Sequence, residues 1–264
     1  MRDDAPSVNA NYPADQVATD AAELVTVCRE ITIARPAYRF YRALLLTFAT
    51  SGVAPDAAEL QRLADMYGVP LEETLDEVAA QDLAQRDPVT GAIRAAYPFS
   101  GVPTAHRVQL AADGADRPAV EVYAMCAIDA LGIPLMLKRA AVVSSRDTLT
   151  GASVRVEVVP TDAGWTSRWE PEGAVVLARP EEHLHEHGVA AAHTCCPVIN
   201  FFAATANAQQ WAVDHTPTDG HIYDQEAALR YASSRFAGIL DRLEDADGRT
   251  GARERAMQSG EEGR

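Results

Sequence analysis

A thiol and a carboxyl that could act together lie in one apolar stretch of the sequence, Tyr123–Pro134. Cys126 and Asp129 stand three residues apart there, among apolar residues that recur at helical spacing. If Ala124–Leu131 is a helix, both side chains face the same way, because residues i and i+3 are neighbours on a helix surface. A buried carboxylate is costly without a partner. The pair is therefore either ordinary core, with the carboxylate bonded to nearby backbone, or one half of a site.

The chain has four cysteines, and their number also suggests chemistry: Cys28, Cys126, Cys195 and Cys196. In a reducing compartment, such a set indicates thiol chemistry or metal binding sooner than a disulfide framework. Cys195 and Cys196 are adjacent, and neighbouring cysteines rarely bond to each other because the closed ring strains the peptide. The apolar run that follows them places both at the edge of the core. Cys28 is expected to be core packing on a helix.

Charge and hydropathy exclude some classes of protein. With 38 acidic and 23 basic residues the formal net charge is −15, which disfavours nucleic acid or an anionic membrane as the main partner. No apolar run approaches the roughly 20 residues that span a bilayer. The start, Met1–Asp4, lacks the basic and apolar parts of a signal peptide. We expect a cytoplasmic protein.

The first part of the chain is predicted to be helical, with helices over 15–30, 38–50, 57–67 and 71–85. A turn at 87–91 separates two segments that can pair as a hairpin. This is the order of a winged helix-turn-helix, whose second helix, here 71–85, would enter DNA. That helix would repel phosphate, since it has no cation and carries Glu72, Glu73, Asp76, Glu77 and Asp82. We therefore expect a structural or dimerising module.

From about Val102 the pattern alternates, which is typical of strands. Strands are expected over 106–110, 120–123, 140–144, 153–159 and 174–178, with further helices over 206–213 and 223–243. The prediction is an α+β fold, in which a helical winged-helix-like module precedes antiparallel strands with interspersed helices. Its parts are an extension and helix at 1–35, the module at 36–100, a core at 101–243 and a flexible tail at 244–264.

A histidine-rich segment lies just before the cysteine pair, with His183, His185, His187 and His193. Histidine and cysteine are zinc ligands, but the alternating spacing does not match a common structural zinc site. A solvated loop is the simpler interpretation. A metal-binding or metal-sensing protein that uses Cys and His remains an alternative, whereas a thiol oxidoreductase would need a Cys-x-x-Cys motif that the chain lacks.

The two cysteine stretches together resemble the organomercurial (alkylmercury) lyases. Residues 123–129, Tyr-Ala-Met-Cys-Ala-Ile-Asp, are similar to that family's Tyr-Ala-x-Cys-Ala-x-Asp motif. Cys196, followed by Asn-Phe-Phe-Ala at 200–203 and then by Trp211, resembles its second cysteine motif. Pro134, Val143-Ser144-Ser145 and Thr150-Gly151 continue the likeness, which covers about Tyr38–Leu243.

The sequence also departs from the family pattern. Met125 stands where family members often have an aromatic residue, and Ser145-Arg146-Asp147 stands where some have an additional cysteine. Cys195 and Cys196 compete for one role. Counting back from Phe201-Phe202 selects Cys196, and a gap placed differently would select Cys195.

The resemblance implies an enzyme that breaks the carbon–mercury bond by protonolysis. Mercury(II) is a soft cation and thiolates are the softest protein ligands. Cys126 and Cys196 would hold the mercury of the substrate, and Asp129 would deliver a proton to carbon, since a carboxyl in an apolar pocket has a raised pKa. No cofactor is implied. Mercury(II) would leave with small cytosolic thiols or a mercuric reductase. A fold that has lost the activity and only binds metal is the remaining alternative.

Overall fold

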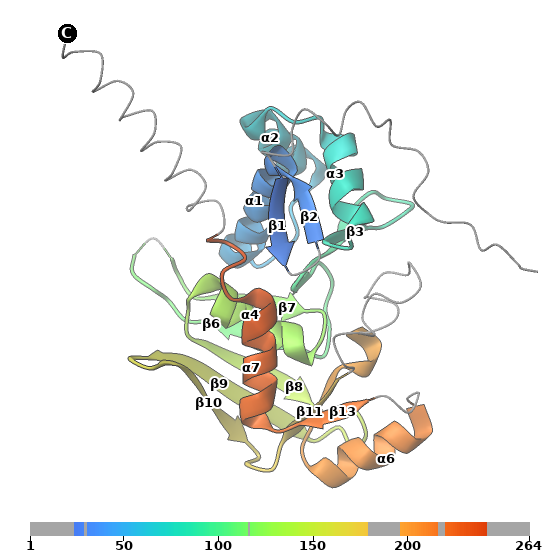
Figure 1. The fold of residues 1–264 in the computed structure, drawn as a ribbon, viewed down its shortest axis with the longest axis vertical. Coiled ribbons are helices and arrows are strands. Elements are labelled where there is room, and N and C mark those ends of the chain that lie inside the picture. The colour runs from blue at the N-terminus through green and yellow to red at the C-terminus, as the bar shows by residue number, and fades with distance from the viewer. Residues whose placement is uncertain (1–23, 29–30, 116, 179–195, 216–219, 242–264) are drawn as a thin grey trace, which may run out of the picture.

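The computed structural model describes residues 24–28, 31–115, 117–178, 196–215 and 220–241. These residues form an α+β fold, with the N-terminal helices on one side and a large antiparallel sheet with further helices on the other (Figure 1). Within these ranges, no helix has both the length and the apolar character to cross a membrane.

The described part begins with a hairpin, which corrects the helix predicted over 15–30. Strand β1 (Leu24–Cys28) pairs antiparallel with β2 (Ile31–Ala34). β-branched residues are frequent in both segments, and such side chains are stiff in a helix but pack well on a pleated surface. Cys28 therefore belongs to strand β1 rather than to the predicted helix.

Three helices follow in the predicted order: α1 (Arg35–Ser51), α2 (Ala57–Tyr67) and α3 (Leu71–Ala80). Helix α2 has the predicted bounds because Asp56 caps its first turn, accepting from Glu59 N at 2.8 Å, and Gly68 ends it in the left-handed conformation. Helix α3 is shorter than predicted, since the chain turns at Asp82, where φ is 54°, to enter a strand.

An antiparallel sheet of eight strands runs through the described structure in the order β10-β9-β8-β6-β7-β5-β4-β3. Its strands are β3 (Ala84–Arg86), β4 (Ile93–Ala96), β5 (Phe99–Ser100), β6 (Arg107–Leu110), β7 (Val120–Ala124), β8 (Ala141–Arg146), β9 (Ser153–Thr161) and β10 (Gly164–Glu170). The predicted hairpin, β3 with β4, forms one edge of this sheet. The sheet therefore spans the boundary at residue 100 that was predicted between the N-terminal module and the core. Strand β10 was not predicted.

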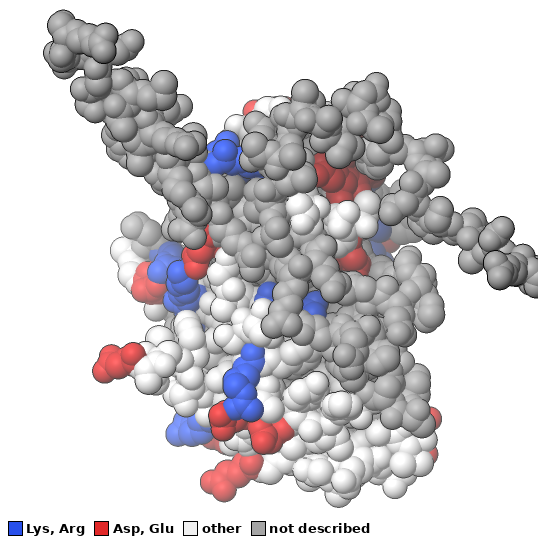
Figure 2. All heavy atoms as spheres, in the orientation of Figure 1, with Lys and Arg blue, Asp and Glu red and all other residues white. Residues whose placement is uncertain are grey.

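The acidic residues of α3 hold the helix to its neighbours. Glu72 and Asp76 form ion pairs with Arg86 of β3 at 2.7 and 2.6 Å, and Glu77 accepts a hydrogen bond from Ala34 N at 2.8 Å. Figure 2 shows acidic side chains gathered over α3. The acidic face noted in the sequence thus has a structural use.

Helix α4 (Ala127–Leu137) lies at the centre of the fold, and every one of its residues is buried. It packs along α7 (Gln225–Phe236), and a Cβ at Gly132 would lie 2.1 Å from Phe236 Cδ2, so this crossing requires glycine. The helix continues past Leu131, the end of the predicted helix, and includes Pro134. A proline removes one intrahelical bond, and burial of the apolar helix outweighs that loss.

A smaller sheet completes the core, in the order β12-β11-β13. It contains β11 (Val175–Ala178), β12 (Asn200–Phe202) and β13 (His221–Tyr223), and α6 (Thr205–His215) packs against it. Helices α6 and α7 occupy the two C-terminal segments where helices were predicted, although α7 begins later and ends earlier than expected.

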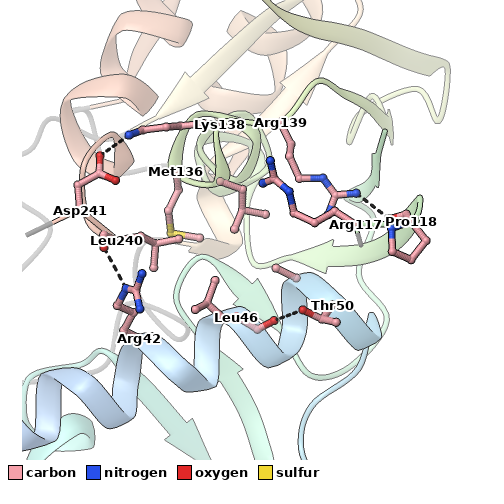
Figure 3. Close-up of a pocket in the computed structure, with 12 residues that line it drawn as sticks. Arg42, Leu46, Thr50, Arg117, Pro118, Met136, Lys138, Arg139, Leu240 and Asp241 are labelled. Atoms are coloured by element: carbon pink, nitrogen blue, oxygen red, sulfur yellow. Dashed lines mark hydrogen bonds and ion pairs between the residues drawn. The ribbon is translucent and has the colours of Figure 1, made fainter. Parts of the chain in front are cut away.

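A cavity of about 220 Å³ marks the joint between α1 and the C-terminal end of α4 (Figure 3). Its basic residues are bonded to protein acceptors. Arg42 Nε donates to the Leu240 carbonyl at 3.0 Å, and Lys138 pairs with Asp241 at 2.8 Å. Arg139 donates to the carbonyls of Ala111 and Pro118, and Arg117 pairs with Asp113. Of these contacts, the bond from Arg42 of α1 joins the N-terminal helices to the core, and the others lie within the core.

Candidate active site

The first half of the site lies at the N-terminus of α4. Cys126 is the N-cap residue and has an extended backbone, with φ −149° and ψ −179°. Its sulfur accepts a hydrogen bond from Asp129 N at 3.4 Å, the position at which serine or aspartate usually caps a helix. The two residues are therefore adjacent, as predicted, but as N-cap and third residue rather than as one helical face. Burial raises the pKa of the Cys126 thiol, and the bond from Asp129 N opposes this rise only in part.

The second half lies in the segment that leads into β12. Cys196 opens a single 3₁₀ turn (Cys196–Val198), which the bond from Ile199 N to the Cys196 carbonyl closes at 3.3 Å. Ala127 N, at the start of α4, donates to the Ile199 carbonyl at 3.1 Å. This backbone bond ties the two cysteine segments together, which explains how residues far apart in the sequence meet.

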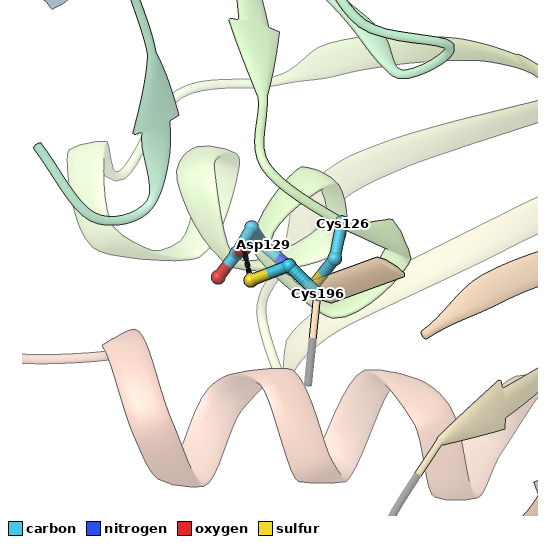
Figure 4. A group of neighbouring side chains, drawn as sticks. All are labelled: Cys126, Asp129 and Cys196. Carbon is cyan, nitrogen blue, oxygen red and sulfur yellow. Dashed lines mark hydrogen bonds between the residues drawn. The ribbon is translucent and has the colours of Figure 1, made fainter. Parts of the chain in front are cut away.

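Cys126, Asp129 and Cys196 form one compact buried group (Figure 4). One potential ligand atom from each, the two sulfurs and a carboxylate oxygen, all lie within 4.8 Å of one another. The Cys196 thiol points at Asp129 Oδ2 over 3.9 Å. Cys126 is 2% exposed, Asp129 5% and Cys196 8%. Such a dry set of two thiols and a carboxyl suits a soft metal that is held by sulfur.

Burial controls the protonation of this group. Desolvation raises the pKa of Asp129 to about 7, against the opposing effects of the bond from Cys126 and the charge of Arg235. Desolvation also raises the pKa of Cys126 well above its usual value, helped by the hydrogen bond with Cys196 and the charge of Asp129. The Asp129 carboxyl is thus partly protonated near neutral pH, and the thiol of Cys126 stays protonated.

Tyr97 also belongs to this neighbourhood, and it was not among the residues predicted from the sequence. Burial of its phenol raises the pKa of Tyr97, and the nearby charges of Cys196, Asp82 and Asp129 act in the same direction. A tyrosine in the apolar run 95–99 was the available signal. The direction in which the Tyr97 side chain points could not be predicted, because it depends on how β4 and β5 pair.

His106 lies against Phe201 of β12 and carries no charge. Its Nδ1 lies 2.9 Å from Ser145 Oγ and its ring is tilted against Phe201, with centroids 5.8 Å apart. Desolvation lowers the pKa of His106 to about 4, so the ring is neutral at neutral pH.

The other residues that the sequence singled out are not part of this buried group of Cys126, Asp129 and Cys196. Cys195, the alternative second thiol, and the histidine-rich segment with His183, His185, His187 and His193 lie outside the described residues. Asp147 belongs to the segment 145–147, where some family members were expected to have a further cysteine. It is buried and accepts hydrogen bonds from Ala203 N and Asn207 Nδ2, both at 2.7 Å.

An α+β fold that buries two thiols beside a carboxyl offers the kind of ligand set that soft metals prefer. Comparison with known proteins makes this specific. The sequence model of the family described as MerB, alkylmercury lyase, matches residues 99–237, more than half of the chain and the part that contains all three residues. The chain belongs to the alkylmercury lyase family of enzymes.

Individual relatives agree with this assignment. An alkylmercury lyase of Staphylococcus epidermidis (strain ATCC 12228 / FDA PCI 1200) is 29% identical over 179 residues, which cover 66% of this chain and 72% of the relative. Among solved structures, the crystal structure of the mercury-bound form of MerB2 is similar, with a TM-score of 0.61 and 19% identity, over 79% of this chain and 93% of that one. The structural likeness shows a shared fold.

Proposed function

We propose that this enzyme cleaves the carbon–mercury bond of alkyl- and arylmercury compounds by protonolysis, with Cys126 and Cys196 as ligands of the substrate's mercury and Asp129 as the acid. The observation that carries the proposal is the buried group itself, whose ligand atoms lie within 4.8 Å of one another. The substrate class follows from the family to which the chain belongs.

The first step exchanges ligands on mercury. In a substrate R–Hg–X, the sulfur of one cysteine replaces X, and its proton leaves with X. The second sulfur then binds the same mercury and passes its proton to the carboxylate of Asp129. The 3.9 Å between Cys196 Sγ and Asp129 Oδ2 supports such a transfer. Two thiolates on one mercury leave more electron density on the bonded carbon.

The second step moves the proton from Asp129 to that carbon. The electron pair of the C–Hg bond becomes the new C–H bond, the hydrocarbon leaves, and mercury stays bound to both thiolates. Mercury is divalent before and after, so no electron donor takes part. Asp129 returns to its carboxylate form. Small thiols then displace mercury(II) and return the protons to the cysteines.

The burial of the site fits an acid that must deliver its proton to carbon rather than to water. Raising the pKa of Asp129 to about 7 lets it hold a proton near neutral pH and release it to a strongly basic carbon centre. The alternative, a protein that binds metal through Cys195, Cys196 and the nearby histidines without lyase activity, needs no acid.

The test is release of benzene from phenylmercury in the presence of excess small thiol. We expect Asp129→Ala to lower the rate by at least ~100-fold, the usual contribution of a positioned acid, and Cys126→Ser and Cys196→Ser to abolish release. Cys28→Ser is the matched control and should keep the wild-type rate. Cys195→Ser tests the other candidate for the second thiol.

Two outcomes would overturn the proposal. Release at the wild-type rate by any one of the three site variants would show that the assigned residue is not needed. Mercury binding by the wild-type protein without benzene release above the thiol-only control would favour the binding protein.

A further inference from the structure

The cavity between α1 and the C-terminal end of α4 has a lining in which cations outnumber carboxylates. Arg42, Arg117, Lys138 and Arg139 line it, together with one carboxylate, that of Asp241 (Figure 3). The whole chain has a formal net charge of −15, so this excess of positive charge is local. A hollow lined by one sign of charge attracts ligands of the opposite sign. The lining therefore favours an anion.

Arg139 is the most deeply buried of these cations, with 5% of its surface exposed. Its Nε donates to the Ala111 carbonyl at 3.1 Å and its Nη2 to the Pro118 carbonyl at 2.7 Å. Both acceptors are neutral, and Nη1 has no hydrogen-bond partner among the described residues. Within the same residues, no carboxylate forms an ion pair with Arg139. A buried cation in this position is stabilised by a counter-charge, which an anionic ligand would supply.

Arg117 brings a second guanidinium to the same part of the cavity (Figure 3). Desolvation and, after it, the positive charge of Arg117 lower the pKa of Arg139, and the charge of Asp113 opposes them with a smaller effect. The two guanidiniums therefore repel each other in the empty cavity. An anion that accepts hydrogen bonds from both would remove this repulsion, and a planar carboxylate matches the donors of a guanidinium.

The remainder of the lining is largely apolar and comes from three elements. Leu46 and Ala49 belong to α1, Met136 and Leu137 to α4, and Leu240 to the segment after α7. The volume is about 220 Å³. An apolar cavity of about 150 Å³ is large enough for benzene, so a ring that carries a carboxylate has room here. The apolar side chains favour such a ligand over a bare inorganic anion, because it buries more apolar surface.

We propose that this cavity binds a small organic anion, a carboxylate on an apolar ring or short chain. Its carboxylate lies between the guanidiniums of Arg117 and Arg139, and its apolar part lies against Leu46 and Met136. The cavity is at the opposite end of α4 from the candidate active site, so the ligand is not the substrate of the proposed cleavage. Because the cavity joins α1 to α4, its occupant would also stabilise the folded protein.

The probe is benzoate, and the methyl NMR signal of Met136 reports where it binds. The full-length protein is isotopically labelled at the methionine methyl groups, and the Met136 signal is assigned by its loss in Met136→Leu. Benzoate should shift this signal until saturation and leave Met66, which is exposed on α2, unchanged. Benzyl alcohol has the same ring without the charge and should bind at least ~10-fold more weakly, since it loses hydrogen bonds between charged groups.

Arginine variants test the two guanidiniums. Arg139→Gln should lower the affinity for benzoate at least ~10-fold, because a hydrogen bond between charged groups is lost. If this buried variant does not fold, Arg117→Gln carries the test with the same expected loss, since its half-exposed ion pair with Asp113 contributes little to stability. Arg107→Gln is the matched control. Arg107 is as exposed as Arg117 and pairs with Glu121 outside the cavity, so its variant should keep the wild-type affinity.

Three results would overturn the inference. The first is the absence of a saturable Met136 shift with benzoate. The second is equal affinity for benzyl alcohol, and the third is wild-type affinity in a folded Arg139→Gln or Arg117→Gln variant. An equal loss of affinity in Arg107→Gln would likewise overturn it, because benzoate would then respond to net charge rather than to a site. The titration needs no mercurial, so its result is independent of benzene release.

Discussion

At the scale of single residues, the burial of Asp129 has a cost that depends on pH. Its pKa is raised from 3.8 to about 7 in the folded protein, so between these values the folded state binds more protons than the unfolded state. The free energy of unfolding must then fall as pH rises through this window. The contribution of the protonated carboxyl is fully present below pH 4 and is lost above pH 7.

Asp129→Asn should expose this cost, because asparagine has nearly the same shape as the protonated acid and does not ionise. We expect the variant to gain stability relative to the wild type between pH 4 and pH 8, by up to about 4 kcal/mol at about 1.4 kcal/mol per pKa unit. Urea unfolding at both pH values measures it. A difference that does not change with pH would contradict the raised pKa.

The pKa shift of His106 has the opposite sign to that of Asp129. The pH dependence of wild-type stability therefore does not report on Asp129 alone. The pKa of His106 is lowered from 6.5 to about 4, and the unfolded state therefore binds more protons between these values. Its contribution to stability is lost as pH falls through this range. The comparison of Asp129→Asn with the wild type cancels this term, since both proteins retain His106.

At the scale of elements, two turns share the pattern Asp-x-x-Thr-Gly, at 87–91 and 147–151. In both, the aspartate Oδ1 accepts from the second and third following amides and the glycine takes a positive φ, 71° and 74°. They differ at Oδ2. Asp87 meets Arg94 at the surface, whereas Asp147 accepts from Ala203 N and Asn207 Nδ2 in the interior. Only the second turn anchors the end of β12.

Asp147→Asn should therefore lower the free energy of unfolding by roughly 2 kcal/mol, because an amide nitrogen in place of Oδ2 would face donors instead of accepting from them. Asp87→Asn is the matched control, with the same local turn, and should change stability little, as is usual for an exposed ion pair. Thermal and urea unfolding measure both. Equal losses in the two variants would show that the local turn, rather than the anchor to β12, matters.

The elements that the sequence predicted best are those with local signals. Helix α2 has both a capping Asp56 and a terminal Gly68, and its bounds match. Strand β1 was taken for a helix because its apolar residues also fit a helical period, and only pairing with β2 decides between the two. The partnership of Cys126 with Cys196 came from a family resemblance. The place of Tyr97 depends on strand pairing that no local pattern encodes.

At the scale of the whole molecule, the N-terminal helices and the core are joined by one sheet and by the contacts around α1. Strands β3 and β4 belong to the sheet that reaches β10, and Arg42 and Tyr38 of α1 bond to carbonyls that follow α7. The division into a module at 36–100 and a core at 101–243 remains a prediction from the sequence. The shared sheet favours one cooperative unit.

Unfolding in urea should accordingly show one transition. The three tryptophans, Trp165, Trp169 and Trp211, all lie in the core, so their fluorescence reports on that part, while far-UV circular dichroism also reports on α1–α3. The two signals should change at the same urea concentration, as two-state unfolding requires. A circular dichroism transition that precedes the fluorescence transition would show that the N-terminal helices unfold separately.

The place of β5 in the sheet has a practical consequence for anyone who isolates the part of the chain that matches the family, residues 99–237. That fragment keeps both thiols and the carboxyl, but it loses β4, the strand that pairs with β5, and it loses Phe48, whose ring stacks on Phe99 at 5.3 Å. An unpaired apolar strand edge is a template for association with other chains. We expect the fragment to aggregate when it is expressed alone, although it contains the whole recognised motif set.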